Sequence, residues 1–450
     1  MKLNLFNWIK TSYFYFSFVI FIGCAVFDRS FVGLKILDFR LGEIIVGGFV
    51  VLSFLFLISP KKVLFNFNLE IFKHEIYIFK VILIYFLFSA FVFRSNLLDI
   101  YVYKSASYIW FLVSFFLLYS CKNKFFKYEK YIKLFSIGFL SIPFVHYFFP
   151  TGYYPDFIMN FFSEYSDKFT FTKGSDIMIV LLMVNLLFFN IQEKKFIPII
   201  YFSISVPLLL PLLLEMSRAS FLATLLFYFL FYLRNYKILT ENKVFFVSII
   251  LISITVFSLS TLRISGVDIY KDSYLEISIS ENIEKIAKKE ESRKAFLSFY
   301  IQDGRVMSRD NTTNWRLDIW QDVIDDLRSK NQMLYGYGYN EIIPVMTDPS
   351  APGRLGRDGL NEHVHSYIFN ILARGGILQL VMFATFHIKL IQTWYKKYND
   401  LGLLIFVLPV VLNSLSDMNM EGVQFPFMYF YFLAYLFMFY NKNNETTLMR

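Results

Sequence analysis

Residues 361–376 read Asn-Glu-His-Val-His-Ser-Tyr-Ile-Phe-Asn-Ile-Leu-Ala-Arg-Gly-Gly, and at this stretch a long polar segment runs back into apolar sequence. His363 and His365 are two residues apart, so in an extended chain both side chains lie on one face. From Ser366 onward the apolar period is helical, and Ser366 is predicted to be the N-cap. Titratable residues at a membrane boundary are a usual place for chemistry in a lipid-soluble protein. We therefore expect the active site at this junction of loop and helix.

The composition of the whole chain predicts an all-α, polytopic membrane protein. Of its 450 residues, 56% are hydrophobic and 21% aromatic, and the mean hydropathy is +0.49, well outside the globular range. The first apolar run is followed by Asp28-Arg29 and not by a small-residue cleavage site, so we expect it to remain as the first span. Cys24 and Cys121 offer neither a disulfide framework nor the spacing of zinc ligands.

Apolar runs long enough, or nearly so, to cross roughly 30 Å of hydrocarbon predict about twelve transmembrane helices. They lie at 13–27, 41–59, 76–93, 101–120, 131–149, 175–191, 196–214, 219–233, 244–262, 375–394, 400–416 and 423–440. The predicted organisation is nine spans in 1–262, one large helical periplasmic loop in 263–365, and three spans with a cytoplasmic tail in 366–450.

The distribution of lysine and arginine orients these spans. With the N-terminus in the cytoplasm, every Lys/Arg-rich loop falls inside, as the positive-inside rule requires, and the C-terminus is cytoplasmic too. The net charge of +9 therefore reflects topology and not nucleic-acid binding. Outside lie 150–174, the turn 215–219 and the loop 263–365. Within the loop, helical patterns at 281–294 and 314–327 predict a small helical cap.

Arg218 lies in a short outer turn between two apolar runs. An arginine there is costly unless it is paired, hydrated or bound to an anion. Its guanidinium is suited to grip a phosphate in a bidentate manner. The alternative is an arginine at a helix end whose head snorkels to the interface.

Two further motifs lie in the outer loop. Arg316 and Trp320 share one helix face at spacing i, i+4, and Gly336-Tyr337-Gly338 allows close backbone approach to a ligand, with tyrosines to stack on sugar rings. An amphipathic helix and a glycine turn without a ligand are the alternative.

His363 and His365 carry the sharper prediction. A neutral imidazole near its ordinary pKa can accept a proton from a hydroxyl group. Together with Glu362 they could instead contribute to a metal site, although no further His or Cys accompanies them outside, or they could form a structural pair at the helix start.

Three motifs in this order resemble the O-antigen ligase/polymerase superfamily: Ser217-Arg218-Ala219, Arg316-x-x-x-Trp320 leading to Gly336-Tyr337-Gly338, and His365-Ser366 followed by Leu372-x-x-Gly375. The resemblance covers roughly residues 200–395 and includes the long outer loop. The chain departs from the family pattern at Ser366, where Asn is common, and at Leu378, where a second glycine is usual; Gly376 is the nearest substitute.

The resemblance implies a metal-independent, inverting glycosyltransferase of the bacterial inner membrane with a periplasmic site and no cofactor. His365 is then the base, Arg218 and Arg316 hold the pyrophosphate, and His363, Glu362, Trp320, Tyr337, Gly336 and Gly338 bind the acceptor or orient His365. The implied partners are an undecaprenyl-diphosphate-linked oligosaccharide, an acceptor glycolipid, the lipid bilayer and a chain-length regulator.

Three functions remain open. An O-antigen polymerase would move the growing chain onto the next lipid-linked repeat unit. We favour it because the chain is rich in residues with A/T-rich codons, as are sequences encoded within antigen-biosynthesis clusters. An O-antigen ligase would move the finished chain to lipid A–core in lipopolysaccharide biosynthesis. A flippase for lipid-linked sugars would show internal repeats and polar residues near mid-membrane, whereas here the polar signals gather on one face.

Overall fold

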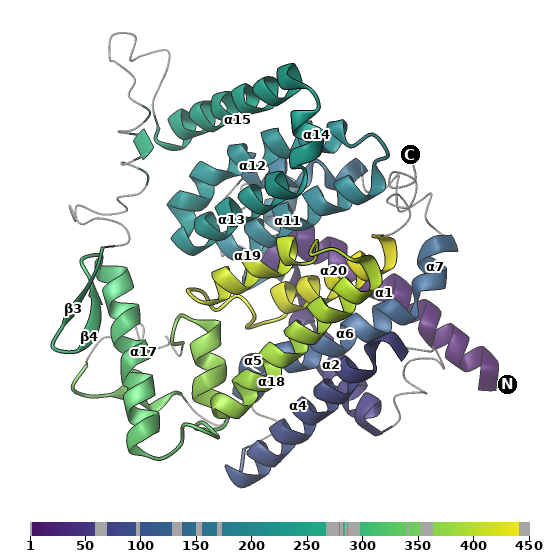
Figure 1. The fold of residues 1–450 in the computed structure, drawn as a ribbon. Helices are drawn as coiled ribbons and strands as arrows, with labels where there is room; N and C mark the ends of the chain where they lie inside the picture. Colours follow the sequence, from purple (N-terminus) through teal and green to yellow (C-terminus); the bar gives the residue numbers. More distant parts are fainter. Residues whose placement is uncertain are drawn as a thin grey trace.

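The computed structural model is built mostly from helices (Figure 1). It describes residues 2–58, 70–95, 100–127, 137–149, 155–168, 173–266, 298–339, 342–351 and 363–440, with 279, 282–283, 286 and 354. The longer helices are α1 (Lys2–Val32), α2 (Leu41–Ile58), α4 (Lys73–Val92), α11 (Gly174–Ile191), α12 (Phe196–Met216), α13 (Arg218–Arg234), α15 (Lys243–Ile264), α17 (Asn311–Ser329) and α18 (Tyr367–Tyr398). The shorter ones are α5 (Ile100–Ser105), α6 (Ser107–Ser120), α7 (Lys122–Lys127), α9 (Ile142–Phe148), α10 (Asp156–Tyr165), α14 (Tyr236–Thr240), α19 (Leu404–Ser414) and α20 (Gln424–Phe439).

Every predicted apolar run coincides at least in part with a described helix, but fewer of these helices are long enough to span a membrane unaided. Seven of the described stretches are, namely Ser12–Val32, Leu41–Ile58, Glu70–Val92, Gly174–Ile191, Phe196–Met216, Lys243–Ile264 and Tyr367–Tyr398. The 14 residues of α6 rise only about 21 Å. The helical membrane architecture is thus confirmed, whereas the count of about twelve spans is not.

The centre of the bundle is formed by α6, α11 and α20. All residues of α6 are buried, and it packs against α20 on one side and α2 on the other. Aromatic rings meet edge to face there, as Phe72 does with Phe115 at 5.0 Å and with Phe437 at 5.1 Å between ring centroids. Because lipid tails are as apolar as these side chains, such close packing and not exclusion from water holds the helices together.

Polar side chains and turns lie at both ends of the bundle, and different residues meet at each end. At one end, Arg234 ends α13 and lies 2.9 Å from Asp400, beside the end of α20. At the other, the end of α1 bonds to residues 166–167, and the turn between α19 and α20 bonds to α17 and to the start of α18. We call the former the inner end and the latter the outer end, after the orientation that the charge pattern of the loops predicts.

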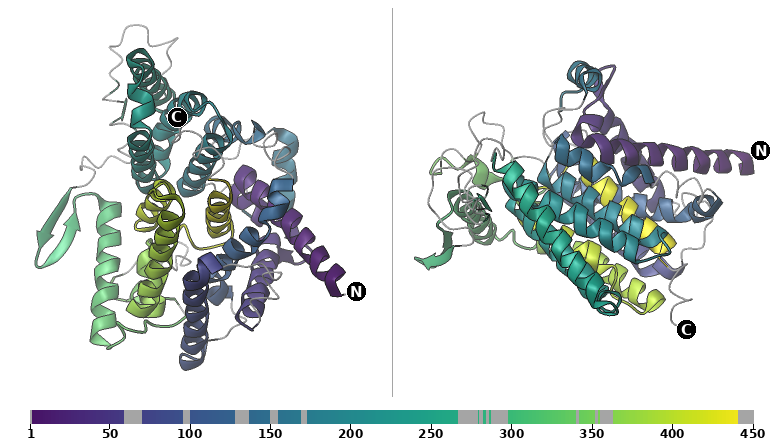
Figure 2. Two further views of the ribbon diagram at one scale, coloured as in Figure 1. Left: turned by 45° about the vertical axis from the view of Figure 1, so that its right-hand side comes forward. Right: turned by 90° about the horizontal axis from the view of Figure 1, so that it is seen from above.

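Much of the described part of the outer loop lies beside the start of α18, on the side of the bundle away from the first turns of α1 (Figure 2). The predicted helix over 314–327 is confirmed as α17, while the pattern at 281–294 falls largely outside the described residues. A hairpin of β3 (Phe299–Gln302) and β4 (Arg305–Ser308), which the sequence did not predict, covers α17. Its register pairs Phe299 with Ser308 and Gln302 with Arg305. A second pair of two-residue strands, β1 (Lys35–Ile36) and β2 (Phe39–Arg40), joins α1 to α2, and 3-10 turns lie at η1 (Glu70–Phe72) and η2 (Pro344–Thr347).

A sharp break divides α18 at Gly376, whose φ of 67° and ψ of −170° are not helical. The first part carries the histidine segment at its start, and the second part is the membrane helix that packs against α4 (Figure 1). The predicted span from residue 375 therefore begins at this break. Only glycine adopts this backbone conformation at little cost.

Candidate active site

Ser366 begins α18 as predicted, because its hydroxyl accepts a hydrogen bond from the Phe369 amide at 3.3 Å. The preceding residue, His365, has a φ of 52°, in the left-handed region that residues other than glycine rarely adopt. Such strain persists only where surrounding contacts impose it, and it concentrates at functional sites.

Contacts from α17 and from the turn after α19 hold this strained segment. The Trp320 indole donates to the Val364 carbonyl at 2.6 Å and its ring stacks on Phe369. The Trp315 ring lies 4.8 Å from the His365 ring, centroid to centroid. Trp320 thus touches the histidine segment itself, while its contact with an acceptor stays a prediction.

His365 is neutral in this setting. Burial lowers its pKa from 6.5 to about 3, helped by the positive charge of Arg316 and by His363, against the opposing charge of Asp417. The imidazole can therefore accept a proton at neutral pH. An anion bound near Arg316 would cancel part of the charge that lowers this pKa and so make His365 a stronger base.

Arg218 and Arg316, predicted from separate motifs, lie close enough for their charges to act on each other, and the charge of Arg316 also acts on His365. Arg218 lies 2.6 Å from Asp310, the residue that caps α17 through a hydrogen bond from the Thr313 amide. Arg316 donates to the Ser416 carbonyl at 2.8 Å, and its charge acts on His365.

Asp310 ties the outer loop to the membrane bundle. Burial by itself would raise the pKa of Asp310, but hydrogen bonds from Thr313 and Arg218 outweigh it, and the pKa lies below the ordinary value. The carboxylate therefore stays charged, and it holds the Arg218 guanidinium beside α17.

The turn between α19 and α20 contributes acidic residues that the sequence reasoning missed. Glu421 is 8% exposed, and its carboxylate lies 3.2 Å from Nδ1 of His363 and 3.7 Å from Nζ of Lys104. The charge of Asp417 acts on both His365 and Arg316, and its backbone carbonyl accepts from the Tyr367 amide at 3.1 Å. Two acidic residues in a short turn between apolar runs were the available signal.

Buried amide and hydroxyl groups fix that turn against α13. The Asn413 amide donates to Ser220 at 3.0 Å, the Asn419 amide donates to Asn413 at 2.8 Å, and the Ser414 hydroxyl donates to Asn419 at 2.8 Å. Since Ser220 lies two residues after Arg218, these hydrogen bonds fix the position of the turn relative to Arg218.

The segment with Gly336 and Gly338 lies against the backbone of α18. The amide of Tyr337 donates to the carbonyl of Ala373 at 2.7 Å, and that of Gly338 donates to Arg374 at 2.9 Å. A Cβ on Gly336 would lie 2.6 Å from the Arg374 carbonyl, so only glycine fits. These contacts hold the break in α18. At Gly338 a φ of 84° and the Phe93 side chain, 2.7 Å from where a Cβ would lie, account for the glycine. Contact of either glycine with a ligand stays a prediction. The Tyr337 hydroxyl donates to Asp326 at 2.5 Å.

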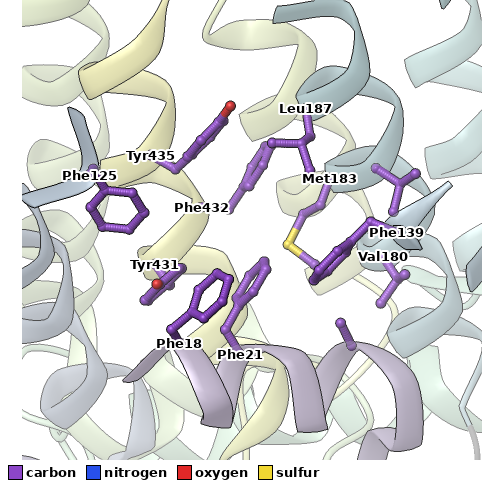
Figure 3. A pocket seen from close by; sticks show the side chains of 12 residues that line it. Phe18, Phe21, Phe125, Phe139, Val180, Met183, Leu187, Tyr431, Phe432 and Tyr435 are labelled. Carbon is purple, nitrogen blue, oxygen red and sulfur yellow. The ribbon is translucent and has the colours of Figure 1, made fainter. Parts of the chain in front are cut away.

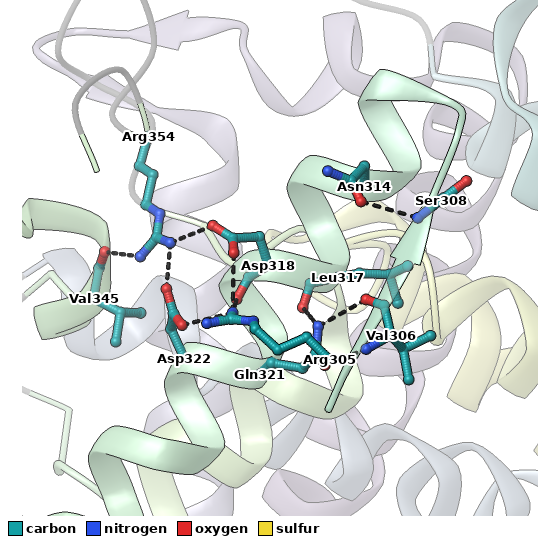
Figure 4. A network of polar contacts seen from close by, with 10 residues as sticks. All are labelled: Arg305, Val306, Ser308, Asn314, Leu317, Asp318, Gln321, Asp322, Val345 and Arg354. Carbon is teal, nitrogen blue, oxygen red and sulfur yellow. Dashed lines mark hydrogen bonds and ion pairs between the residues drawn. The ribbon is translucent and has the colours of Figure 1, made fainter. Parts of the chain in front are cut away.

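Arg305 and Arg354 belong to a separate network that supports α17 (Figure 4). Arg305 lies 2.9 Å from Asp318 and 2.7 Å from Asp322, and the buried Arg354 bonds to the same two carboxylates and to the Val345 carbonyl. Each cation is matched by carboxylate oxygens. The network therefore holds the hairpin, Val345 and Arg354 on the helix.

An apolar cavity of about 40 Å³ is lined by side chains of α1, α11 and α20 together with Phe125 and Phe139 (Figure 3). Phe21, Met183 and Tyr431 are among its lining residues. It contributes no side chain to the candidate site.

The remaining predictions concern Glu362 and metal. Glu362 lies outside the described residues. Among the residues that are described, no group of three or more His, Cys, Asp or Glu side chains is arranged to hold a metal ion. Metal independence itself stays a prediction.

Comparison with known proteins bears on the same part of the chain. Residues 203–384 match the model of the family described as O-antigen ligase, and no curated protein matches the chain. The matched stretch begins in α12, includes Arg218, Arg316 and both histidines, and ends in α18 beyond the break at Gly376. It therefore confirms the resemblance found in the sequence: residues 203–384 match the O-antigen ligase family model, which is consistent with the O-antigen ligase/polymerase superfamily.

Proposed function

We propose that this membrane protein is a glycosyltransferase that moves an oligosaccharide from undecaprenyl diphosphate to a hydroxyl group of an acceptor glycolipid on the periplasmic face. The observation that carries the proposal is the grouping of a neutral, strained His365 with Arg218 and Arg316 at the outer end of the bundle. A base and two cations are what an acid–base displacement of a diphosphate leaving group needs.

In the proposed reaction, a ring nitrogen of His365 takes the proton of the acceptor hydroxyl. The oxygen attacks the anomeric carbon of the donor sugar, a new glycosidic bond forms with inversion, and the bond to the phosphate oxygen breaks. The electron pair leaves with undecaprenyl diphosphate. Asp417 opposes the charges that lower the pKa of His365, so it would stabilise the imidazolium that the proton transfer creates.

Arg218 and Arg316 would face the diphosphate. Their guanidinium groups are held by Asp310 and by the Ser416 carbonyl, so little reorganisation is needed as negative charge develops. Because cations of the protein balance that charge, we expect transfer to continue in the presence of EDTA.

Two acceptors fit this chemistry. With a second lipid-linked repeat unit as acceptor the protein is an O-antigen polymerase, which we propose first. With lipid A–core as acceptor it is an O-antigen ligase, and the description of the matched family favours that alternative. Neither motif nor fold separates the two acceptors, because the donor half of the reaction is the same. The matched family does not favour a flippase.

Glycolipid analysis of a deletion strain separates the alternatives. Lipid A–core that carries a single repeat unit indicates a lost polymerase, whereas bare core with long undecaprenyl-linked chains indicates a lost ligase. The strain is complemented with the wild-type gene or with His365→Ala, at equal membrane levels of both proteins. Full restoration of the wild-type ladder by His365→Ala would overturn the assignment of the base.

A further inference from the structure

A second group of cations lies at the outer end, next to residues 166–168. The Ser166 hydroxyl donates to the Ser30 carbonyl at 2.8 Å, and Leu34 and Ser166 form a β-bridge. A Cβ on Gly33 would lie 2.9 Å from the Cβ of Lys168. Lys168 is therefore held against the end of α1.

Arg29, Arg40 and Lys104 lie close enough to Lys168 for their charges to act on it. Arg40 lies 2.6 Å from Asp167, Arg29 lies 3.7 Å from Asp176, and Lys104 lies 3.7 Å from Glu421. Each of these three cations has a carboxylate neighbour of its own, and Lys168 adds a further positive charge to the group.

The pKa of Lys168 reflects its burial first and these neighbouring charges second. Burial lowers its pKa, and the charges of Arg29, Arg40 and Lys104 lower it further, against Asp167 alone. The pKa of Lys173, at the start of α11, is lowered by burial and by Arg29, although Asp417, Asp176 and Glu421 oppose the shift. Bringing like charges together in a partly buried place costs free energy, and a bound anion would offset that cost.

This group and the Arg218–Arg316 pair both adjoin the histidine segment. Glu421, which Lys104 and Arg29 influence, contacts His363, while Arg316 acts on His365. We propose that Lys168, Lys104 and Arg29 form a second anion subsite, which binds the phosphate group of the lipid-borne acceptor while the Arg218–Arg316 pair binds that of the donor. This inference rests on the proposed function.

The depth of these cations suits a phosphate carried by a lipid. Arg29 ends the first membrane helix and Lys173 precedes another, so both lie where a lipid headgroup meets the outer face. A lipid diphosphate or the phosphorylated headgroup of another glycolipid offers the same chemistry, and the acceptor hydroxyl would reach His365 from that side.

Steady-state kinetics of the purified protein in lipid nanodiscs test the subsite. Lys168→Gln and Lys104→Gln should each raise the KM for a diphosphate-bearing acceptor by about five- to tenfold, as expected for the loss of one charge-assisted contact. The donor KM and kcat should stay within about twofold of the wild-type values, because the proposed subsite binds the acceptor and not the donor. A twofold change is well below the tenfold change to which 1.4 kcal/mol corresponds. Lys389→Gln, which removes a partly exposed lysine from α18, is the matched control and should change neither KM.

The chemistry and source of the anion are separated by acceptor and competitor. A dephosphorylated acceptor should bind wild type and Lys168→Gln equally, and inorganic diphosphate should compete with acceptor in the wild type and less in the variant. A preference for polyprenyl diphosphate over a phosphorylated lipid A–core acceptor would assign the subsite to a polymerase, and the reverse preference to a ligase.

Other outcomes overturn the inference. An equal rise in the KM for donor and acceptor would show that these cations serve the donor, and no rise at all would show that they bind neither. If the wild type transfers no sugar, the proposed function fails instead. Direct binding of the acceptor to His365→Ala, with and without Lys168→Gln, then still tests the subsite.

Discussion

The two ends of the bundle use similar residues in opposite ways. At the inner end, Asp400 accepts hydrogen bonds from Arg234 at 2.9 Å, from the Trp394 indole at 2.7 Å, from the Gly402 amide at 2.8 Å and from the Tyr440 hydroxyl. At the outer end, His365 is strained, and within the described part of the chain the buried Nε atoms of Arg29 and Arg316 have no hydrogen-bond partner. A fully bonded charge stabilises the fold, whereas incompletely bonded charges leave capacity for a ligand.

The largest effect should follow from removing the base at the outer end. His365→Ala should lower kcat of the purified enzyme by about 10² to 10⁴, the usual range for loss of a general base. The control is His74→Ala, which changes an exposed histidine at the start of α4 and should retain wild-type kcat. A kcat within threefold of wild type in both variants would remove the basis for treating the outer end as catalytic.

Replacing one arginine at each end sharpens the comparison. Arg218→Gln should lower kcat/KM for the donor by about 10²-fold, because a cation beside the leaving group is lost. Arg218→Lys should recover part of this loss, since a lysine keeps the positive charge but cannot bind a phosphate in a bidentate manner. Asp310→Asn shows how much of the effect comes from the lost ion pair. If Arg234→Gln, at the inner end, lowers kcat/KM as strongly, the contrast between the ends fails.

At the inner end the expected effect is on stability. Asp400→Asn weakens several hydrogen bonds to one partly exposed carboxylate and should cost about 1–3 kcal/mol of unfolding free energy. A lower midpoint of thermal unfolding in detergent, with unchanged kcat per folded molecule, is the expected result. Asp417→Asn at the outer end should instead lower kcat and leave the midpoint of thermal unfolding unchanged. Loss of kcat in both variants would mean that the two ends are coupled.

The pH dependence follows from the lowered pKa of His365. Its pKa in the folded protein is about 3, below its ordinary value of 6.5, so the unfolded chain binds more protons between these values. The contribution of His365 to stability is therefore constant above pH 6.5 and declines as the pH falls from 6.5 toward 3. His365→Ala should lose less stability than wild type between pH 7 and pH 4, as measured by thermal unfolding. An equal loss in both proteins would contradict the burial of this imidazole.

The smallest effect is expected at Tyr337. Its hydroxyl bonds to the partly exposed Asp326, so Tyr337→Phe should cost about 0.5–1.5 kcal/mol of stability and change kcat/KM less than twofold. Lys330→Gln, which removes the lysine that also contacts Asp326, is its control. A tenfold rise in the acceptor KM for Tyr337→Phe alone would instead assign Tyr337 to the acceptor.

Local patterns predicted the helices and part of the site. Apolar runs and helix signals depend on neighbouring residues, so the helical membrane class, α17 and the cap at Ser366 could be read directly. Arg218 and Arg316 stood out because charged groups next to apolar spans are costly. The hairpin over α17 was missed, since its eight paired residues become a hairpin only against the Gln321 side chain and the Arg305 network.

By itself, the sequence determined that this chain forms apolar helices, roughly which stretches they occupy, and which titratable residues lie between them. Only the tertiary structure decided that Asp417 and Glu421 face the histidines, that Gly336 and Gly338 clasp the break at Gly376, and that cations from distant segments surround Lys168. The physical reason is range. Hydropathy and helix capping act over a few residues, whereas a site is made by contacts between segments hundreds of residues apart.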